Sequence, residues 1–309
     1  MAWPTAARDR ETFCVSCHTA VPYAVSRPAL RKVLAEETPT VTERKLLDNV
    51  RKRVRLWQNV GLCYSSMAAE SRGTKAILNA LILVSYDAQN GQLSADARAA
   101  FANMWALQQT EGDEKGSWAW LQFGSEPWEA YDSRYYGASL VAVAVGTAPM
   151  NYRATPEIEY LNREYHTQSP VNQVVLLWAS LKLPGLLEHG KQEAIINEVL
   201  SRQQADGGWS LSSLVGTWKR KDGTPLVMQS DGYATGLITF ALQQAGISRE
   251  DIRVKRGLTW LVRNQSIWNG HWAAYSLNKK RRNPFSDVAR FMDDAATAYA
   301  VLALTQGNQ

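Results

Sequence analysis

The feature that most constrains the fold is an apolar segment that occurs twice in the chain. Residues 231–246 read DGYATGLITFALQQAG and residues 293–307 read DDAATAYAVLALTQG. Aligning them places Asp231 on Asp293 and matches a threonine four residues later in each copy. Asp is favoured at helix N-caps, and apolar residues too dense for one stripe are typical of a helix buried on nearly all sides. Both segments therefore predict interior helices.

Half-polar segments alternate with such apolar segments along the chain. They carry charges on one side and Leu, Ile, Val or Trp on the other, as amphipathic helices do. Because apolar helices are buried only if the helix pairs close around one another, the pattern predicts an all-α chain arranged as a ring of helix hairpins, an α/α toroid. The half-polar segments are 43–58, 95–109, 191–204 and 249–265, and the further apolar segments are 70–83, 135–145 and 171–181.

The turns between the two kinds of helix carry a recurring motif. Residues 203–209 read QQADGGW, a Q-x-x-D-G-G-W pattern, and looser copies span 108–118 and 264–272. Glycine adopts the positive φ values that follow a helix end, the Asp carboxylate accepts backbone N–H groups in the turn, and the Trp ring is expected to lie against the Gln amide. These residues are expected to stabilise the turns and not to catalyse a reaction.

The Q-x-x-D-G-G-W turn and the D-x-x-x-T start of the inner helices resemble squalene–hopene cyclases and the wider terpenoid cyclase and prenyltransferase superfamily of α/α toroids. The resemblance covers residues 41–309 and is sharpest from residue 195 onward. It implies a toroid domain over 41–309 whose apolar central cavity holds an isoprenoid-like ligand. Residues 1–40 are then expected to form a separate, irregular N-terminal arm.

The catalytic motifs of that superfamily are missing from the sequence. The D-x-D-D acid motif of the class II cyclases does not occur, because Phe291 stands two residues before Asp293. The zinc site of the protein prenyltransferases lacks its cysteine, because Tyr233 stands at that position. Asp231 and Asp293 remain as candidate catalytic acids, and the favoured alternative for both is a role as helix N-caps.

A C-x-x-C-H motif near the start of the chain carries the strongest chemical signal. In FCVSCHT, Cys14 and Cys17 are spaced for two thioether bonds to a haem, and the adjacent His18 imidazole is placed to ligate the iron. The motif predicts one covalent c-type haem, with His18 as the metal ligand. Two alternatives stay open: a zinc site that adds Cys63, and a dithiol redox site, which is typical of a thioredoxin-like fold.

The surroundings of the motif carry three further expectations. Pro22 and Pro28 favour an irregular segment over a helix. With three cysteines no disulfide framework is expected, and Cys63 stands in what looks like an ordinary apolar position. A C-x-x-C-H-T segment ahead of a toroid also resembles a set of bacterial cyclase-like proteins in which it follows a secretion signal. This implies a periplasmic or otherwise exported protein, whose signal we expect to have been trimmed.

Charge and hydropathy limit the classes of partner. The chain has a net charge of +5, and its basic runs at 51–55, 218–221 and 278–283 lack the interleaved aromatic residues of nucleic-acid sites, so no nucleic acid is expected. The longest apolar runs, 76–83 and 139–146, are too short to span a membrane. Peripheral membrane contact stays open.

Three functions follow from these observations. The leading one is redox chemistry or electron transfer by a haem-carrying toroid that meets an apolar small-molecule ligand or a redox partner protein. The first alternative is a haem-free, terpenoid cyclase-like enzyme that uses Asp231 or Asp293 as its acid. The second is a toroid that binds ligands or partners without catalysis. Whether the chain is an enzyme stays open.

Overall fold

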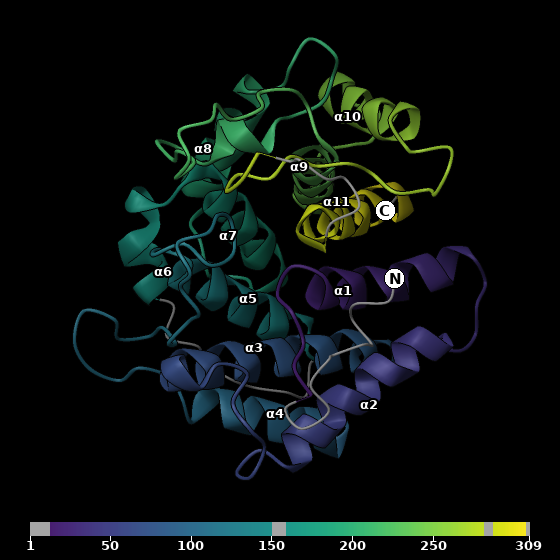
Figure 1. The fold of residues 1–309 in the computed structure, drawn as a ribbon. Helices are drawn as coiled ribbons and strands as arrows, with labels where there is room; N and C mark the ends of the chain where they lie inside the picture. Colours follow the sequence, from purple (N-terminus) through teal and green to yellow (C-terminus); the bar gives the residue numbers. More distant parts are fainter. Residues whose placement is uncertain (1–12, 150–158, 281–286, 307–309) are drawn as a thin grey trace.

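The computed structural model describes residues 13–149, 159–280 and 287–306, which form an all-α protein (Figure 1). These residues contain eleven α-helices and four short 3-10 helices, and none of them lies in a β-strand. The all-α prediction is confirmed. The α-helices are α1 (Ala20–Val33), α2 (Val41–Arg55), α3 (Ala68–Asp87), α4 (Ala95–Trp105), α5 (Arg134–Thr147), α6 (Glu159–Glu164), α7 (Pro170–Lys182), α8 (His189–Ser201), α9 (Gly232–Gln244), α10 (Ile252–Arg263) and α11 (Asp287–Thr305).

The helices α1, α3, α5, α7, α9 and α11 pack against one another in chain order. Each contacts the next, and α11 packs in turn on α1 (Figure 1). Helix α9 is buried from Gly232 to Leu242, as the dense apolar pattern predicts. The remaining contacts come from outer helices, with α2 and α4 on α3, α8 on α7 and α10 on α9.

The N-terminal segment is more regular than its prolines predict. Residues Ala20–Val33 form α1, with Pro28 inside the helix, so the expectation of an irregular arm is wrong for this part of 1–40. Pro22 lies in the first turn, where its missing N–H is not needed. Pro28 removes one internal hydrogen bond, and the packing of α1 on α3 and α11 offsets that loss. Residues 1–12 lie outside the described residues, and the domain boundary at residue 40 stays a prediction.

The three motif turns share one hydrogen-bonding arrangement. In each turn a Trp indole N–H donates to a carbonyl of the preceding outer helix, and a Gln side-chain amide donates to a glycine carbonyl. The indole bonds are Trp118 to Met104 (2.7 Å), Trp209 to Val199 (2.6 Å) and Trp272 to Leu261 (2.7 Å). The amide bonds are Gln108 to Gly116 (3.2 Å), Gln203 to Gly207 (2.9 Å) and Gln265 to Gly270 (2.8 Å).

The turn at 203–209 has the chemistry that its sequence predicts. Gly207 has a φ of 93°, a value that favours glycine. One carboxylate oxygen of Asp206 accepts the N–H of Gly208 at 3.0 Å, and the other accepts the indole N–H of Trp260 in α10 at 3.0 Å. The turn therefore joins two successive helix pairs, and its role is structural.

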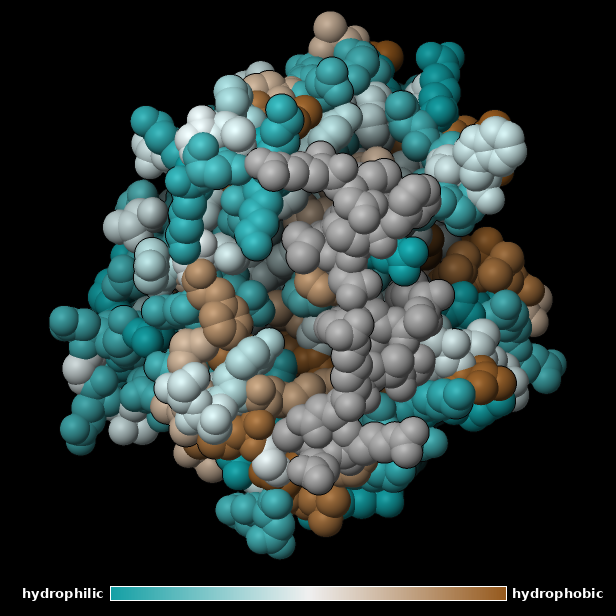
Figure 2. Space-filling model, in the orientation of Figure 1, coloured by the Kyte–Doolittle hydropathy of each residue, from teal (hydrophilic) through white to brown (hydrophobic). Residues whose placement is uncertain are grey.

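Most large apolar side chains of the described residues are inside the protein. The face drawn in Figure 2 is largely hydrophilic, with apolar residues in separate groups. No helix in the described ranges has the length and hydropathy that crossing a membrane requires.

Candidate functional site at the C-x-x-C-H turn

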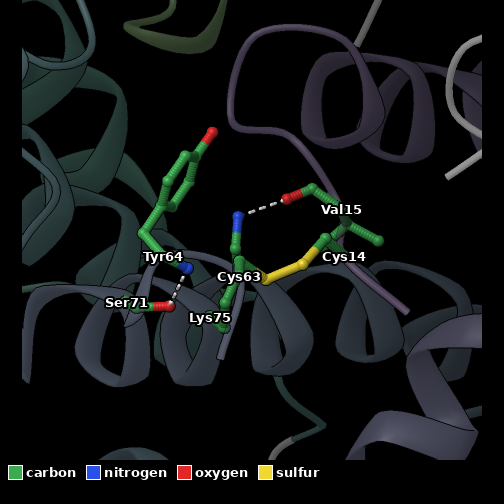
Figure 3. The surroundings of a disulfide bond; sticks show 6 residues. All are labelled: Cys14, Val15, Cys63, Tyr64, Ser71 and Lys75. Carbon is green, nitrogen blue, oxygen red and sulfur yellow. Dashed lines mark hydrogen bonds between the residues drawn. A yellow bond between two sulfur atoms is a disulfide. The ribbon is translucent and has the colours of Figure 1, made fainter. Parts of the chain in front are cut away.

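The C-x-x-C-H motif forms a turn that leads into α1 and lies over α3 (Figure 3). Cys14 is disulfide-bonded to Cys63, and their Cα atoms are 6.1 Å apart. From α3, the buried Nζ of Lys75 donates to the carbonyl of Val15 at 2.6 Å. The turn is thus held by a covalent bond and by a buried hydrogen bond.

The disulfide corrects the expectation for Cys63. The sequence treats this residue as an ordinary apolar position, and Cys14 as a thiol available for another bond. The Cα separation lies within the range of protein disulfides. The two cysteines are 49 residues apart in the chain, and they meet because α1 and α2 lead the chain back to the start of α3.

Cys17 points to a different part of the site. Its side chain is buried, and its thiol donates to the carboxylate of Glu129 at 3.4 Å. Burial raises the pKa of this thiol well above its usual value, and the charge of Glu129 adds to the effect. Burial also raises the pKa of Glu129. Because only thiolates are strong nucleophiles, Cys17 is unreactive in this state.

His18 lies between two aromatic side chains. Its ring stacks on Phe291 of α11 with 4.0 Å between centroids, and it is tilted against Trp128 at 5.7 Å. Its Nδ1 is 3.1 Å from the hydroxyl oxygen of Thr19. Burial, together with the positive charge of Lys75, lowers the pKa of His18 to about 3. The imidazole is therefore neutral near pH 7, the form that ligates metals.

A pocket of about 210 Å³ opens beside His18. Trp128, Phe291 and Met292 form apolar parts of its wall, and Glu126 and Glu129 are among its polar residues. The pocket takes its walls from the C-x-x-C-H turn, the loop around residue 126, residues 276–279 and residues 291–292 of α11.

Two loops of this pocket are joined by one side chain. The amide of Asn278 accepts the backbone N–H of Glu126 at 2.9 Å and donates to the Glu126 carbonyl at 2.7 Å. The Glu126 side chain is 7% exposed, and burial together with the nearby charge of Asp132 raises its pKa to about 8. Glu126 is therefore mostly protonated at pH 7 and is a hydrogen-bond donor inside the pocket.

The motif fits a c-type haem in composition and spacing, but its disulfide-bonded state does not. Two thioether bonds need both motif thiols, and the Cys14 sulfur is already bonded to Cys63. The same bond removes two donors from the alternative zinc site. Within the described residues, no group of three or more His, Cys, Asp or Glu side chains is placed to hold a metal ion.

The two candidate acids lie in structural positions. Asp231 caps α9, and its carboxylate accepts the backbone N–H groups of Ala234 (3.0 Å) and Leu211 (2.6 Å). Burial raises its pKa to about 7. Asp293 accepts the N–H of Ala274 at 3.1 Å, and a carboxylate oxygen lies 3.6 Å from Nε2 of His271.

Asp293 differs from the predicted N-cap because α11 begins six residues earlier, at Asp287. Its carboxylate is turned toward the preceding turn and not toward the end of its own helix. Neither Asp293 nor Asp231 lines the pocket beside His18. A catalytic role for either residue stays a prediction.

Sequence reasoning did not select Lys75, Glu126 or Glu129. Lys75 lies in an apolar helix, where its charge was the one visible signal. The two glutamates flank a Pro-Trp pair in the segment EPWE at 126–129, which has neither helical nor strand periodicity. They become site residues only because the loop folds against α11 and the C-x-x-C-H turn.

Comparison with known protein families gives no match for this chain, and a search of curated proteins likewise finds no relative. The site is therefore interpreted from its own residues.

Proposed function

We propose that the chain is an exported α/α-toroid protein that carries one covalent c-type haem and works in electron transfer. The observation that carries the proposal is the position of the His18 side chain in the structure. The C-x-x-C-H turn sets its neutral imidazole at the wall of a pocket, between the aromatic rings of Trp128 and Phe291. In this assignment Cys14 and Cys17 hold the haem, and His18 ligates its iron.

The succession of helices supports the toroid. Six inner helices pack one on the next in chain order, and the last packs on the first. Three turns between outer and inner helices repeat the same Trp and Gln hydrogen bonds. A repeated helix pair with a repeated turn is typical of closed or stacked helical repeats.

The thiol state of Cys14 decides whether the haem can be attached. Opening the Cys14–Cys63 disulfide takes two electrons and two protons from a thiol reductant and frees the Cys14 thiol. Cys17 must in addition leave its buried contact with Glu129 before a haem can be attached. The haem supplies an iron whose potential depends on its ligands and on the exposure of the group. The chain contributes the neutral His18, an apolar wall and the buried carboxyl groups of Glu126 and Glu129.

A haem-free acid enzyme is the second candidate, and one observation favours it. Glu126 lines the pocket with a carboxyl group that stays protonated near pH 7, as a general acid requires. In that case Glu126 is a better acid than Asp231 or Asp293, whose carboxylates bind backbone N–H groups. Turnover that disappears in Glu126→Gln and survives in Asp231→Asn would support it.

The haem proposal is tested by exporting the full chain in a host that attaches c-type haem. The purified protein should show a Soret band and a pyridine haemochrome spectrum, and Cys14→Ser or Cys17→Ser should reduce the haem content strongly. Cys63→Ser is the matched control, because it removes the disulfide as Cys14→Ser does and leaves the motif intact. A colourless wild-type protein from a host that loads a reference cytochrome would overturn the proposal.

A further inference from the structure

Two adjacent apolar side chains project from the turn after α10. Ile267 is 89% exposed and Trp268 is 90% exposed, the highest values among large apolar residues in the described part of the chain. The turn that presents them is ordered by its own backbone. The N–H of Ser266 donates to the carbonyl of His271 at 2.9 Å, and the N–H of Gly270 donates to Ser266 at 2.8 Å.

The fold does not need apolar residues at this place. The equivalent turn after α8 makes the same Gln and Trp hydrogen bonds, and it carries Ala205 and Asp206 between them. In that turn the Asp206 carboxylate is used in hydrogen bonds to the protein. Ile267 and Trp268 have no comparable role, so their exposure calls for a reason outside the fold.

Two further exposed apolar residues lie on α10, among exposed polar and charged ones. Ile252 is 66% exposed and Val262 is 65% exposed, and they lie ten residues apart on a helix whose buried face packs on α9. Figure 1 shows α10 and the loop that follows it at the edge of the molecule. We refer to the exposed residues of α10 and the turn at 266–270 as the α10 surface.

The chain that forms this surface is basic. Residues 252–270 contain four Lys or Arg residues and no Asp or Glu, and the two acids directly before them pair with Arg253 (Asp251, 2.9 Å) and Lys255 (Glu250, 3.2 Å). Arg263, which is exposed, ends α10 directly before the turn. The four residues are Arg253, Lys255, Arg256 and Arg263.

We propose that the α10 surface binds a membrane surface that contains anionic lipids. Trp side chains favour the headgroup region of a bilayer. Apolar residues beside Lys and Arg on one helix are typical of segments that lie on such a surface. Each basic residue near an anionic leaflet adds attraction that falls off over about a Debye length. Ile267 and Trp268 would insert at headgroup level, and the cations would contact the headgroups.

A lipid surface explains the geometry better than a protein groove does. The two side chains stand on a turn at the edge of the molecule, and nine-tenths of each is exposed. A fluid bilayer takes up such a projection without a complementary shape, whereas stable protein interfaces bury about 1,200–2,000 Å² between matching surfaces.

The test is sedimentation of the full chain with vesicles of phosphatidylcholine alone or of phosphatidylcholine mixed with phosphatidylglycerol. The protein should bind the mixed vesicles more tightly, and added salt should weaken the binding. The double variant Ile267→Ser/Trp268→Ser should lose about tenfold or more in affinity for the mixed vesicles. Tyr131→Ser, which removes an aromatic residue that is 74% exposed elsewhere, is the matched control and should bind as the wild type does.

The outcomes separate the possibilities. Equal binding by the double variant and the wild type would overturn the assignment of the surface. No binding to either vesicle, or equal binding to both, would overturn the preference for anionic lipid. Haem content does not enter the measurement, so its result is independent of the proposed redox function.

Discussion

Cys14 and Cys63 form a disulfide that ties the first cysteine of the C-x-x-C-H motif to the segment before α3 (Figure 3). The second motif cysteine, Cys17, lies instead against Glu129, and His18 lines the pocket. A covalent haem needs both motif thiols, so the disulfide-bonded and haem-bound states of Cys14 exclude one another. Whether Cys14 is a free thiol or disulfide-bonded thereby determines whether the proposed haem can be attached.

The first prediction concerns the competition for Cys14. Cys63→Ser should raise the fraction of exported protein that carries haem, because Cys14 then has no partner for the disulfide. Haem per polypeptide is measured from the pyridine haemochrome spectrum and the protein concentration. Wild-type protein exported with an added thiol reductant should approach the variant. Equal loading of variant and wild type without reductant would show that the disulfide does not compete.

The second prediction concerns stability. The disulfide closes a loop with a sequence separation of 49 residues that contains α1 and α2. The chain-entropy relation gives about 4 kcal/mol for a loop of this length. Reduction of the haem-free protein should therefore lower its free energy of unfolding in urea by a few kcal/mol. Cys17→Ser should keep this sensitivity to reductant, whereas Cys63→Ser should lose it. If reduction does not change the urea midpoint of the wild-type protein, the Cys14–Cys63 disulfide is contradicted.

The third prediction concerns pH. Burial raises the pKa of Glu126 from 4.5 to about 8. Between these values the folded state holds a proton that the unfolded state has released, so stability falls as pH rises through this window. The slope is at most about 1.4 kcal/mol per pH unit for one group. Glu126→Gln should remove this contribution in urea unfolding measured at several pH values.

The interval from pH 7 to 8 lies above the raised pKa of Asp231, at about 7. Lys75, whose pKa burial lowers to about 8, contributes to the slope there in the wild type and the variant alike, so the difference between the two slopes reports Glu126. Glu111→Gln, at an exposed acid, is the control and should keep the wild-type slope. Parallel slopes for wild type and Glu126→Gln over this interval would mean that Glu126 is ionised in the folded protein.

The fourth prediction concerns the indole hydrogen bonds of the turns. Trp209→Phe keeps most of the buried ring but removes the 2.6 Å indole bond to the Val199 carbonyl, which then keeps only the Arg202 N–H at 3.2 Å. The net contribution of one hydrogen bond is about 0.5–1.5 kcal/mol, and the loss should appear in urea unfolding. Trp268→Phe, at a position that is 90% exposed, should change stability little. Similar stabilities for both variants would remove the structural role that we assign to the turn.

The local parts of the fold follow from the sequence, and the long-range contacts do not. The turn at Asp206 and Gly207 is predicted because a helix end and its glycines are set by neighbouring residues. The hydrogen-bond partner of the Trp209 indole, the Val199 carbonyl, is not predicted from the sequence. That choice depends on how the turn folds back on its own helix.

Tertiary packing also decides two of the positions where sequence reasoning failed. Pro28 lies inside α1 because contacts with α3 and α11 compensate for its missing hydrogen bond. Cys63 finds Cys14 only after α1 and α2 have folded back. Neither contact leaves a periodic pattern in the sequence, and the same is true of the meeting of Glu129 with Cys17.

The central claim is tested most directly by the intact mass of the exported protein under denaturing conditions. We predict a mass that exceeds the polypeptide by one haem, which survives denaturation because both thioethers are covalent. A mass lower than the polypeptide by two hydrogens, without haem, would mean that the Cys14–Cys63 disulfide persists in the mature protein. That result, in a host that loads a reference c-type cytochrome, would contradict the haem assignment.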